Sequence, residues 1–142
     1  MVNQIRVLLV DDETVLLEAI TKLLTRRGMV VQTALNGLEA IEISSREQFD
    51  VIVLDVRMPV MDGITAMVEI RRRDPLTPVL FLSGQADLAR VTEALRNGAV
   101  DYLLKPCEVE VLISAIENAC ERKAIGLEIA KKTLKDQRRN KI

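Results

Sequence analysis

VIVLDVRMPVMDG, residues 51–63, begins with four apolar residues and reaches Asp55 as soon as that run ends. A short apolar run rich in β-branched residues is typical of a strand buried on both faces, as in a parallel sheet. The Asp62-Gly63 pair marks a turn and the start of a helix. This stretch therefore predicts a buried strand, a loop, and a helix that begins near Ile64 and is closed by Asp74-Pro75.

The same alternation of strand and helix extends in both directions along the chain. Short apolar runs predict four more strands, at Ile5–Val10, Met29–Ala34, Val79–Leu82 and Ala99–Leu104. Apolar residues at helical spacing and helix-ending glycines predict helices at Thr14–Arg27, Leu38–Arg46, Ala86–Arg96 and from about Glu108 onward. Parallel strands need crossover connections, so this pattern predicts a parallel sheet with helices on both faces. The fold class is α/β with a (βα)₅ layout.

The composition favours one domain and argues against several classes of protein. With 142 residues, 49% of them hydrophobic, the chain has the size and apolar content of a single domain. Its two cysteines, Cys107 and Cys120, and its lack of histidine argue against a disulfide scaffold and a zinc site. It has no signal-peptide layout and no apolar run near the roughly 18 residues that span a bilayer. We therefore expect a cytoplasmic protein without a membrane partner.

Charge divides the chain into an acidic body and a basic tail. Residues 1–121 carry 12 basic and 19 acidic side chains, a net −7, whereas residues 122–142 carry 8 and 2, a net +6. We assign residues 1–122 to the folded domain and residues 123–142 to a basic C-terminal tail, either a helix extension or a linker. About 20 residues cannot form a DNA-binding domain, so we expect no direct nucleic-acid binding.

A helix extension would give the tail the pattern of a coiled coil. The apolar residues near a 3.5-residue spacing are Ile113, Ile116, Cys120, Leu127, Ala130 and Leu134. Lys123 and Gly126 weaken this pattern, and a solvated linker is the alternative.

Polar residues follow four of the five predicted strands. Asp11 and Asp12 come after the first strand, Asp55 after the third, Ser83 after the fourth, and Lys105 just beyond the fifth. Ligands bind at the carboxyl ends of the strands in such sheets, so we expect these side chains to meet at one edge. Asp11 and Asp12 alone could serve as turn and helix-capping residues. Together with Asp55 and Lys105 they favour a binding site.

Three crowded carboxylates repel one another and need a positive partner. Lys105 supplies one charge, and the hard oxygen ligands of the three aspartates suit Mg²⁺ (or Mn²⁺). A carboxylate beside a metal ion and a lysine can attack phosphorus, because both cations neutralise charge on the phosphoryl oxygens. Asp55, from the central strand, is the predicted nucleophile.

Four short motifs accompany these residues in order along the chain. They are VDDE (residues 10–13), DVRMPVMDG (55–63), LSG (82–84) and DYLLKP (101–106). Over about residues 4–122, the chain resembles the response-regulator receiver domains of two-component signal transduction, such as the chemotaxis regulators. The resemblance implies a flavodoxin-like, doubly wound sheet with strand order 2-1-3-4-5 between two layers of helices. It also implies a phosphorylation-dependent signalling switch rather than an enzyme, whose only chemistry is its own phosphoryl transfer and slow autodephosphorylation.

The resemblance implies a role for each residue of the site. Asp55 would be the phosphoacceptor, Asp12 a direct Mg²⁺ ligand, and Asp11 a ligand acting mostly through water. The backbone carbonyl of Arg57 would be the third protein ligand. Lys105 would pair with Asp55 or with the phosphoryl oxygens.

The resemblance also implies residues that respond to the phosphoryl group and residues that determine how long it stays on Asp55. Ser83 would hydrogen-bond to it and move toward it, and Tyr102 would swing inward into the space that Ser83 leaves. The peptide before Pro106 would be cis, which X-Pro bonds permit at low cost. Arg57 and Gln85 match family positions that tune phosphoryl lifetime, and we expect them to do so here.

The implied partners follow from the same chemistry. The chain has no histidine, so the phosphohistidine donor must be another protein, a sensor histidine kinase or a phosphotransfer protein. The surface of the fourth helix, fifth strand and fifth helix would change on phosphorylation and could support a homodimer.

Three other functions were compared with this one. A phosphatase with an aspartate nucleophile would need an acid or base two residues beyond Asp55, where Arg57 is a poor proton donor or acceptor. A flavin or nucleotide site would need Gly, Ser or Thr in the first loop, where Asp11, Asp12 and Glu13 would repel phosphate. A receiver-like domain that binds partners without phosphorylation stays open as an alternative.

Overall fold

The computed structural model describes residues 4–84 and 88–139, and five strands and five helices alternate along them. The strands are β1 (Arg6–Val10), β2 (Val30–Ala34), β3 (Val51–Leu54), β4 (Val79–Ser83) and β5 (Asp101–Leu104). The helices are α1 (Thr14–Arg26), α2 (Gly37–Arg46), α3 (Gly63–Arg73), α4 (Leu88–Arg96) and α5 (Val109–Arg139). The expected start of the fourth helix at Ala86 lies outside the described residues.

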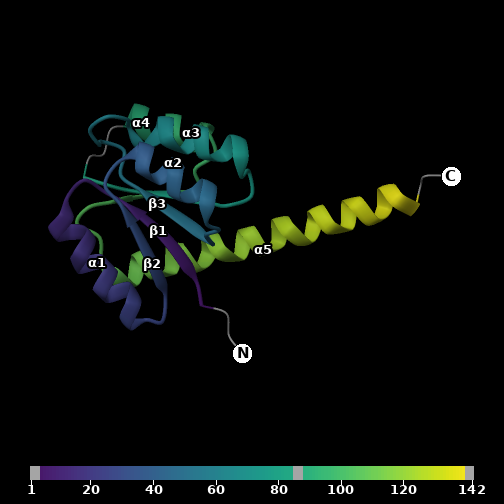
Figure 1. The fold of residues 1–142 in the computed structure, drawn as a ribbon, viewed down its shortest axis with the longest axis horizontal. Helices are drawn as coiled ribbons and strands as arrows, with labels where there is room; N and C mark the ends of the chain where they lie inside the picture. Colours follow the sequence, from purple (N-terminus) through teal and green to yellow (C-terminus); the bar gives the residue numbers. More distant parts are fainter. Residues whose placement is uncertain (1–3, 85–87, 140–142) are drawn as a thin grey trace.

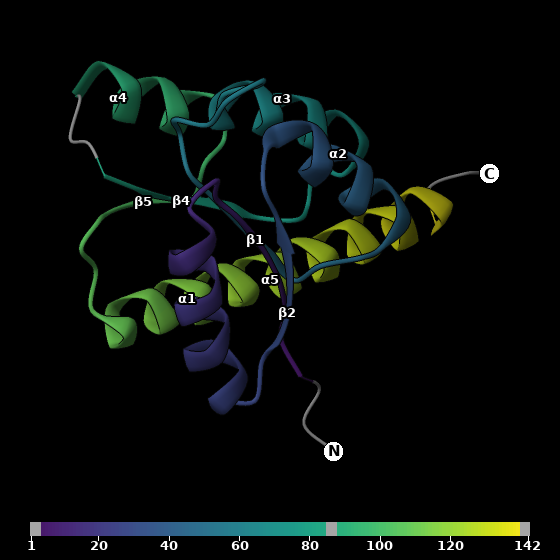
Figure 2. The ribbon, with the colours of Figure 1, turned by 60° about the vertical axis from the view of Figure 1, so that its left-hand side comes forward.

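The strands form one parallel sheet between two layers of helices. The strand order is β2-β1-β3-β4-β5, which confirms the predicted order 2-1-3-4-5 and the flavodoxin-like fold. α2, α3 and α4 lie on one face of the sheet, and α1 and α5 lie on the other (Figures 1 and 2). All five strands therefore end at the same edge.

The central strand β3 explains why residues 51–54 show no polar alternation. Ile52 and Leu54 pack into the core under α2, α3 and α4, whereas Val51 and Val53 pack into the core under α1 and α5. All four side chains are buried. Each such burial stabilises the fold by about 1.5–3 kcal/mol, so a polar residue in this strand would be costly.

Three predicted strands began too early: the first by one residue, at Ile5 rather than Arg6, and the second and fifth at residues that close a helix. The prediction that the second strand begins at Met29 and the fifth at Ala99 was wrong, because both amides close the preceding helix. The N–H of Met29 donates to Leu24 O, and that of Ala99 donates to Ala94 O. A glycine with positive φ permits each reversal: Gly28 (84°) and Gly98 (109°). The other predicted ends that fall on described residues either agree with the structure or differ by a single residue.

α5 continues far past the sheet as one uninterrupted helix. Ile113 and Ile116 are buried against the sheet, and the Lys123 Nζ donates to Phe49 O at 2.6 Å. From Leu127 to Arg139 every residue is exposed, and Figure 1 shows this part projecting away from the body of the molecule. The tail is thus helical through Arg139, and only Leu127, Ala130 and Leu134 of the expected seam are free of the domain. Among the helices of the described residues, none has both the length and the apolar content to cross a bilayer.

Candidate functional site

The parallel register brings the polar strand ends together. Asp55 N donates to Val10 O at 3.1 Å, so the residue after β3 lies beside the end of β1. Lys105 N donates to Ser83 O at 2.8 Å, which places the residue after β5 beside the end of β4. Backbone hydrogen bonds between neighbouring strands therefore determine how far apart the residues of the site lie.

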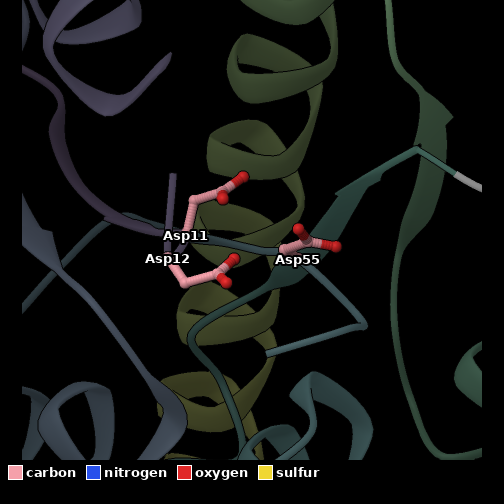
Figure 3. Close-up of side chains that lie close together, drawn as sticks. All are labelled: Asp11, Asp12 and Asp55. Atoms are coloured by element: carbon pink, nitrogen blue, oxygen red, sulfur yellow. The ribbon is translucent and has the colours of Figure 1, made fainter. Parts of the chain in front are cut away.

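Three carboxylates meet at this edge. Each of Asp11, Asp12 and Asp55 offers one oxygen, and these oxygens all lie within 4.8 Å of one another. Figure 3 shows the three side chains grouped where β1 and β3 end. Asp11 and Asp55 are buried, whereas Asp12 is exposed. A set of oxygen donors at this spacing, open to solvent on one side, has the chemistry that a hard divalent cation requires.

Lys105 places a positive charge between two of these carboxylates. Its Nζ lies 2.6 Å from Asp11 Oδ2 and 3.2 Å from Asp55 Oδ2, with Glu13 farther away at 3.9 Å. Burial alone would lower the pKa of Lys105, but the hydrogen bond to Asp11 and the charges of Asp55 and Asp11 outweigh it and raise the pKa above its usual 10.5. Lys105 is thus a fixed ammonium in the site.

Asp55 is held by donors on both of its oxygens. Ser83 Oγ donates to Oδ1 at 3.0 Å, and the backbone N–H of Arg57 donates to the same oxygen at 3.2 Å. Lys105 donates to Oδ2. These contacts fix the carboxylate plane, with the oxygens turned toward the polar edge of the sheet rather than toward the core.

The loop after Asp55 packs tightly against it. A side chain at Gly63 would place its Cβ 2.0 Å from the Asp55 carbonyl oxygen, so only glycine fits there. Gly63 N donates to Val56 O at 2.8 Å and closes the loop. The Lys105–Pro106 peptide on the opposite side of the site is cis.

Comparison with known proteins identifies the family. The profile of the response regulator receiver domain matches residues 7–117. The chain belongs to the response regulator receiver family. This assignment agrees with the resemblance seen in the sequence, and a receiver domain is a signalling domain rather than a classical enzyme.

Relatives of the receiver domain include much longer proteins. A protein-glutamate methylesterase/protein-glutamine glutaminase of Archaeoglobus fulgidus is 46% identical over 121 residues, which are 83% of this chain and 34% of that protein. Regulatory protein AtoC of Escherichia coli is 34% identical over 87% of this chain and 27% of its own. The chain thus spans about a third of the length of these curated relatives, or less.

A solved structure shows the same fold at the same size. A response regulator receiver domain protein from Clostridium thermocellum is 34% identical, with a TM-score of 0.81 over 85% of this chain and 98% of that one.

Tyr102 lies on the edge strand β5 of the receiver domain. Its ring stacks in a tilted arrangement on Phe81, with centroids 5.8 Å apart, and the side chain is half-buried. Phe81 is on β4, two residues before Ser83, so Tyr102 and Ser83 share one strand pair. Gln85 lies outside the described residues.

Sequence reasoning missed two residues beside the site. Asp62 was interpreted as a helix start, and its Oδ1 does accept the Thr65 N–H at 2.9 Å as the N-cap of α3. Its other oxygen, Oδ2, binds Arg90 Nη2 of α4 at 2.9 Å. Partial burial would raise the pKa of Asp62, but the Thr65 and Arg90 hydrogen bonds lower it overall. No spacing in the sequence indicates this pair, because it depends on where α4 lies.

Asp62 and Arg90 line an open cleft next to the carboxylates. The cleft is bounded by Asp12, Val56, Arg57, Met58, Pro59, Asp62 and Arg90. Asp12, the exposed carboxylate of the cluster, is one of the residues that line it.

Proposed function

We propose that this receiver domain is a phosphorylation-dependent signalling switch. Asp55 accepts a phosphoryl group from a phosphohistidine on a partner, a sensor histidine kinase or a phosphotransfer protein. The observation that supports this most directly is the group of Asp11, Asp12 and Asp55 oxygens within 4.8 Å, with Lys105 Nζ in contact with two of the three residues.

The chain's own residues prepare Asp55 for attack on phosphorus. Lys105 and the Arg57 N–H orient the carboxylate, and the cleft beside Asp12 leaves room for the donor. An Asp55 oxygen forms the bond to phosphorus while the bond to the donor imidazole nitrogen breaks. Lys105 then neutralises part of the charge on the phosphoryl oxygens.

The donor set also fits Mg²⁺ (or Mn²⁺). Asp11, Asp12, Asp55 and the backbone carbonyl of Arg57 would hold the ion, with Asp11 acting mostly through water. When bound, such an ion neutralises phosphoryl oxygens and aligns the transferring group. Arg57 and Gln85 would set how long the aspartyl phosphate survives before it hydrolyses slowly.

Phosphorylation would change the surface formed by α4, β5 and α5, and partners would bind there. Ser83 would leave the Asp55 carboxylate to bind the phosphoryl group, and Tyr102 would turn into the space beside it. Exposed apolar residues on these elements could dock a partner or a second copy: Leu88, Leu95, Leu104 and Val111. A shift between two populated arrangements is enough for such a switch.

We place the receiver domain at residues 1–122 and treat residues 123–142 as a separate extension. We infer a cytoplasmic location and no direct binding of nucleic acid or membrane by this chain. The enzymatic and regulatory activities named for the longer relatives are activities of those proteins, and this chain matches about a third of each or less.

The decisive experiment is intact-mass analysis after incubation with acetyl phosphate. We expect a gain of one phosphoryl mass that requires Mg²⁺ and disappears in Asp55→Asn and after chelation. Asp136→Asn is the matched control, since it removes an exposed carboxylate on the projecting helix. If the wild-type protein gains no phosphoryl group from acetyl phosphate or from any phosphohistidine donor, the chain is an interaction domain that works without phosphorylation.

A further inference from the structure

Arg90 joins α4 to the loop beside Asp55 through an ion pair. Its Nη2 lies 2.9 Å from Asp62 Oδ2, and its Nη1 lies 2.9 Å from Glu93 Oε2 on the next turn of α4. Asp62 uses its other oxygen to cap α3 at Thr65. The Arg90 and Asp62 side chains are only 32% and 38% exposed, so water screens the pair in part.

α4 is weakly attached by apolar contacts. Of its nine residues only Ala94 is buried, whereas α3 buries five of its eleven residues. The position of a surface helix is normally fixed by the apolar face that it buries. Because Ala94 buries little area, a polar contact such as Arg90–Asp62 has an unusually large influence on where α4 lies.

The other end of the ion pair holds a strained loop. Val60, two residues before Asp62, has φ of 74°, which a β-branched residue rarely adopts. The same loop carries Arg57, whose N–H binds Asp55 Oδ1. Asp62 therefore anchors the end of a segment whose shape determines the surroundings of Asp55.

The Ser83 contact relates α4 to the chemical state of Asp55. Ser83 Oγ donates to Asp55 Oδ1 at 3.0 Å, a bond that belongs to the free carboxylate. Once the carboxylate carries a phosphoryl group, the charged acceptors lie on the phosphoryl oxygens, farther out from β3. Ser83 ends β4 and Leu88 begins α4 five residues later in the chain, so the strand end that carries this contact leads directly to α4 in sequence.

We propose that the Arg90–Asp62 ion pair is a restraint that holds α4 in the arrangement accompanying the free Asp55 carboxylate, and that phosphorylation works against it. This inference rests on the proposed phosphorylation of Asp55. By linkage, any change that removes the restraint must favour the phosphorylated arrangement by the same factor. A partly exposed ion pair of this kind corresponds to about a two- to fivefold effect.

The test uses beryllofluoride with Mg²⁺ as the phosphoryl analogue, titrated calorimetrically into the full chain. Arg90→Met and Asp62→Asn should each bind it about two- to fivefold more tightly than wild type. Asn remains a good N-cap, so Asp62→Asn removes the charge without removing the cap of α3. The double variant should bind no more tightly than the tighter single variant, and Arg90→Lys should return the affinity to near the wild-type value.

Arg72→Met is the matched control, because Arg72 pairs with Glu69 within α3 and, among the described residues, has no ion pair with a second element. Hydrogen exchange gives an independent readout: in Arg90→Met and Asp62→Asn, α4 amides should exchange faster and α3 amides at the wild-type rate. Unchanged affinities, additive effects in the double variant, or unchanged α4 exchange would overturn the restraint while phosphorylation of Asp55 stands. Failure of the wild-type protein to bind beryllofluoride would overturn the proposed function, and the inference with it.

Discussion

Lys105 Nζ lies closer to Asp11 than to Asp55, at 2.6 Å against 3.2 Å. The family resemblance implied Asp55 or the phosphoryl oxygens as the partner of Lys105. The shorter contact means that Lys105 neutralises the buried carboxylate of Asp11 while it still donates to Asp55, the proposed phosphoacceptor.

Lys105→Met should therefore destabilise the protein and increase its dependence on metal. Two buried carboxylates would lose their ammonium partner, at a cost of about 3–5 kcal/mol. Because Mg²⁺ would then be the main counter-charge, it should raise the melting temperature of the variant more than that of wild type. Lys131→Met is the control, since Lys131 is exposed and pairs within its own helix. Equal Mg²⁺ effects on both variants would contradict this role.

Gly63→Ala should distort the proposed phosphorylation site. The new Cβ would lie 2.0 Å from the Asp55 carbonyl oxygen, so the backbone has to move. We expect a loss of about 1–3 kcal/mol in unfolding free energy and a clear drop in phosphorylation by acetyl phosphate. Gly84→Ala has open space around its Cβ and should leave the unfolding free energy nearly unchanged. Chemical denaturation of the two variants compares them directly.

Gly126→Ala should stabilise the protein. Gly126 lies inside α5, and a Cβ there would make ordinary contact with Leu76 at 3.4 Å. Replacing a helical glycine with alanine contributes about 0.5–1 kcal/mol. The expected readouts are a higher melting temperature and slower hydrogen exchange around residue 126. A lower melting temperature would show that α5 bends or ends at this position in solution.

The two cysteines should differ in their reaction with iodoacetamide as pH rises. Burial, and then the charge of Asp50, raises the pKa of Cys120 to about 11. Burial and Glu108 also raise the pKa of Cys107, which lies on a loop. The rate at Cys120 should still be increasing at pH 10, and Cys107 should react first at pH 8. Since the raised pKa favours the neutral thiol, the stability that Cys120 contributes is complete below pH 9.0 and is lost as pH rises toward 11. Peptide mass mapping over a pH series distinguishes the sites.

The order of strands and helices could be predicted from residues 51–63 and from the similar apolar runs and helical segments before and after them. Apolar periodicity identifies the elements, and the handedness of crossover connections leaves few topologies for a parallel sheet. The meeting of Asp11, Asp55, Ser83 and Lys105 followed, since parallel strands end at one edge. The Asp62–Arg90 contact could not be predicted, because it depends on the placement of α4. This helix buries only Ala94, so its apolar pattern does not indicate where it lies. The path of the tail depended on Lys123 and Gly126. The structure shows Lys123 bound to Phe49 O and Gly126 inside the continuous helix α5, and neither fact could be read from the sequence.

The single helix α5 makes the outer surface of the molecule sensitive to small movements at the sheet. The residues that pack on β3 and β4 and the exposed residue Leu134 belong to one continuous helix, roughly 46 Å long at 1.5 Å per residue. A rotation of the packed half about its own axis turns the outward direction of Leu134 through the same angle. A sliding of the packed half moves Arg139 by the same distance. A rotation or translation of α5 at the sheet would therefore also move its projecting end, without any change of conformation within the helix.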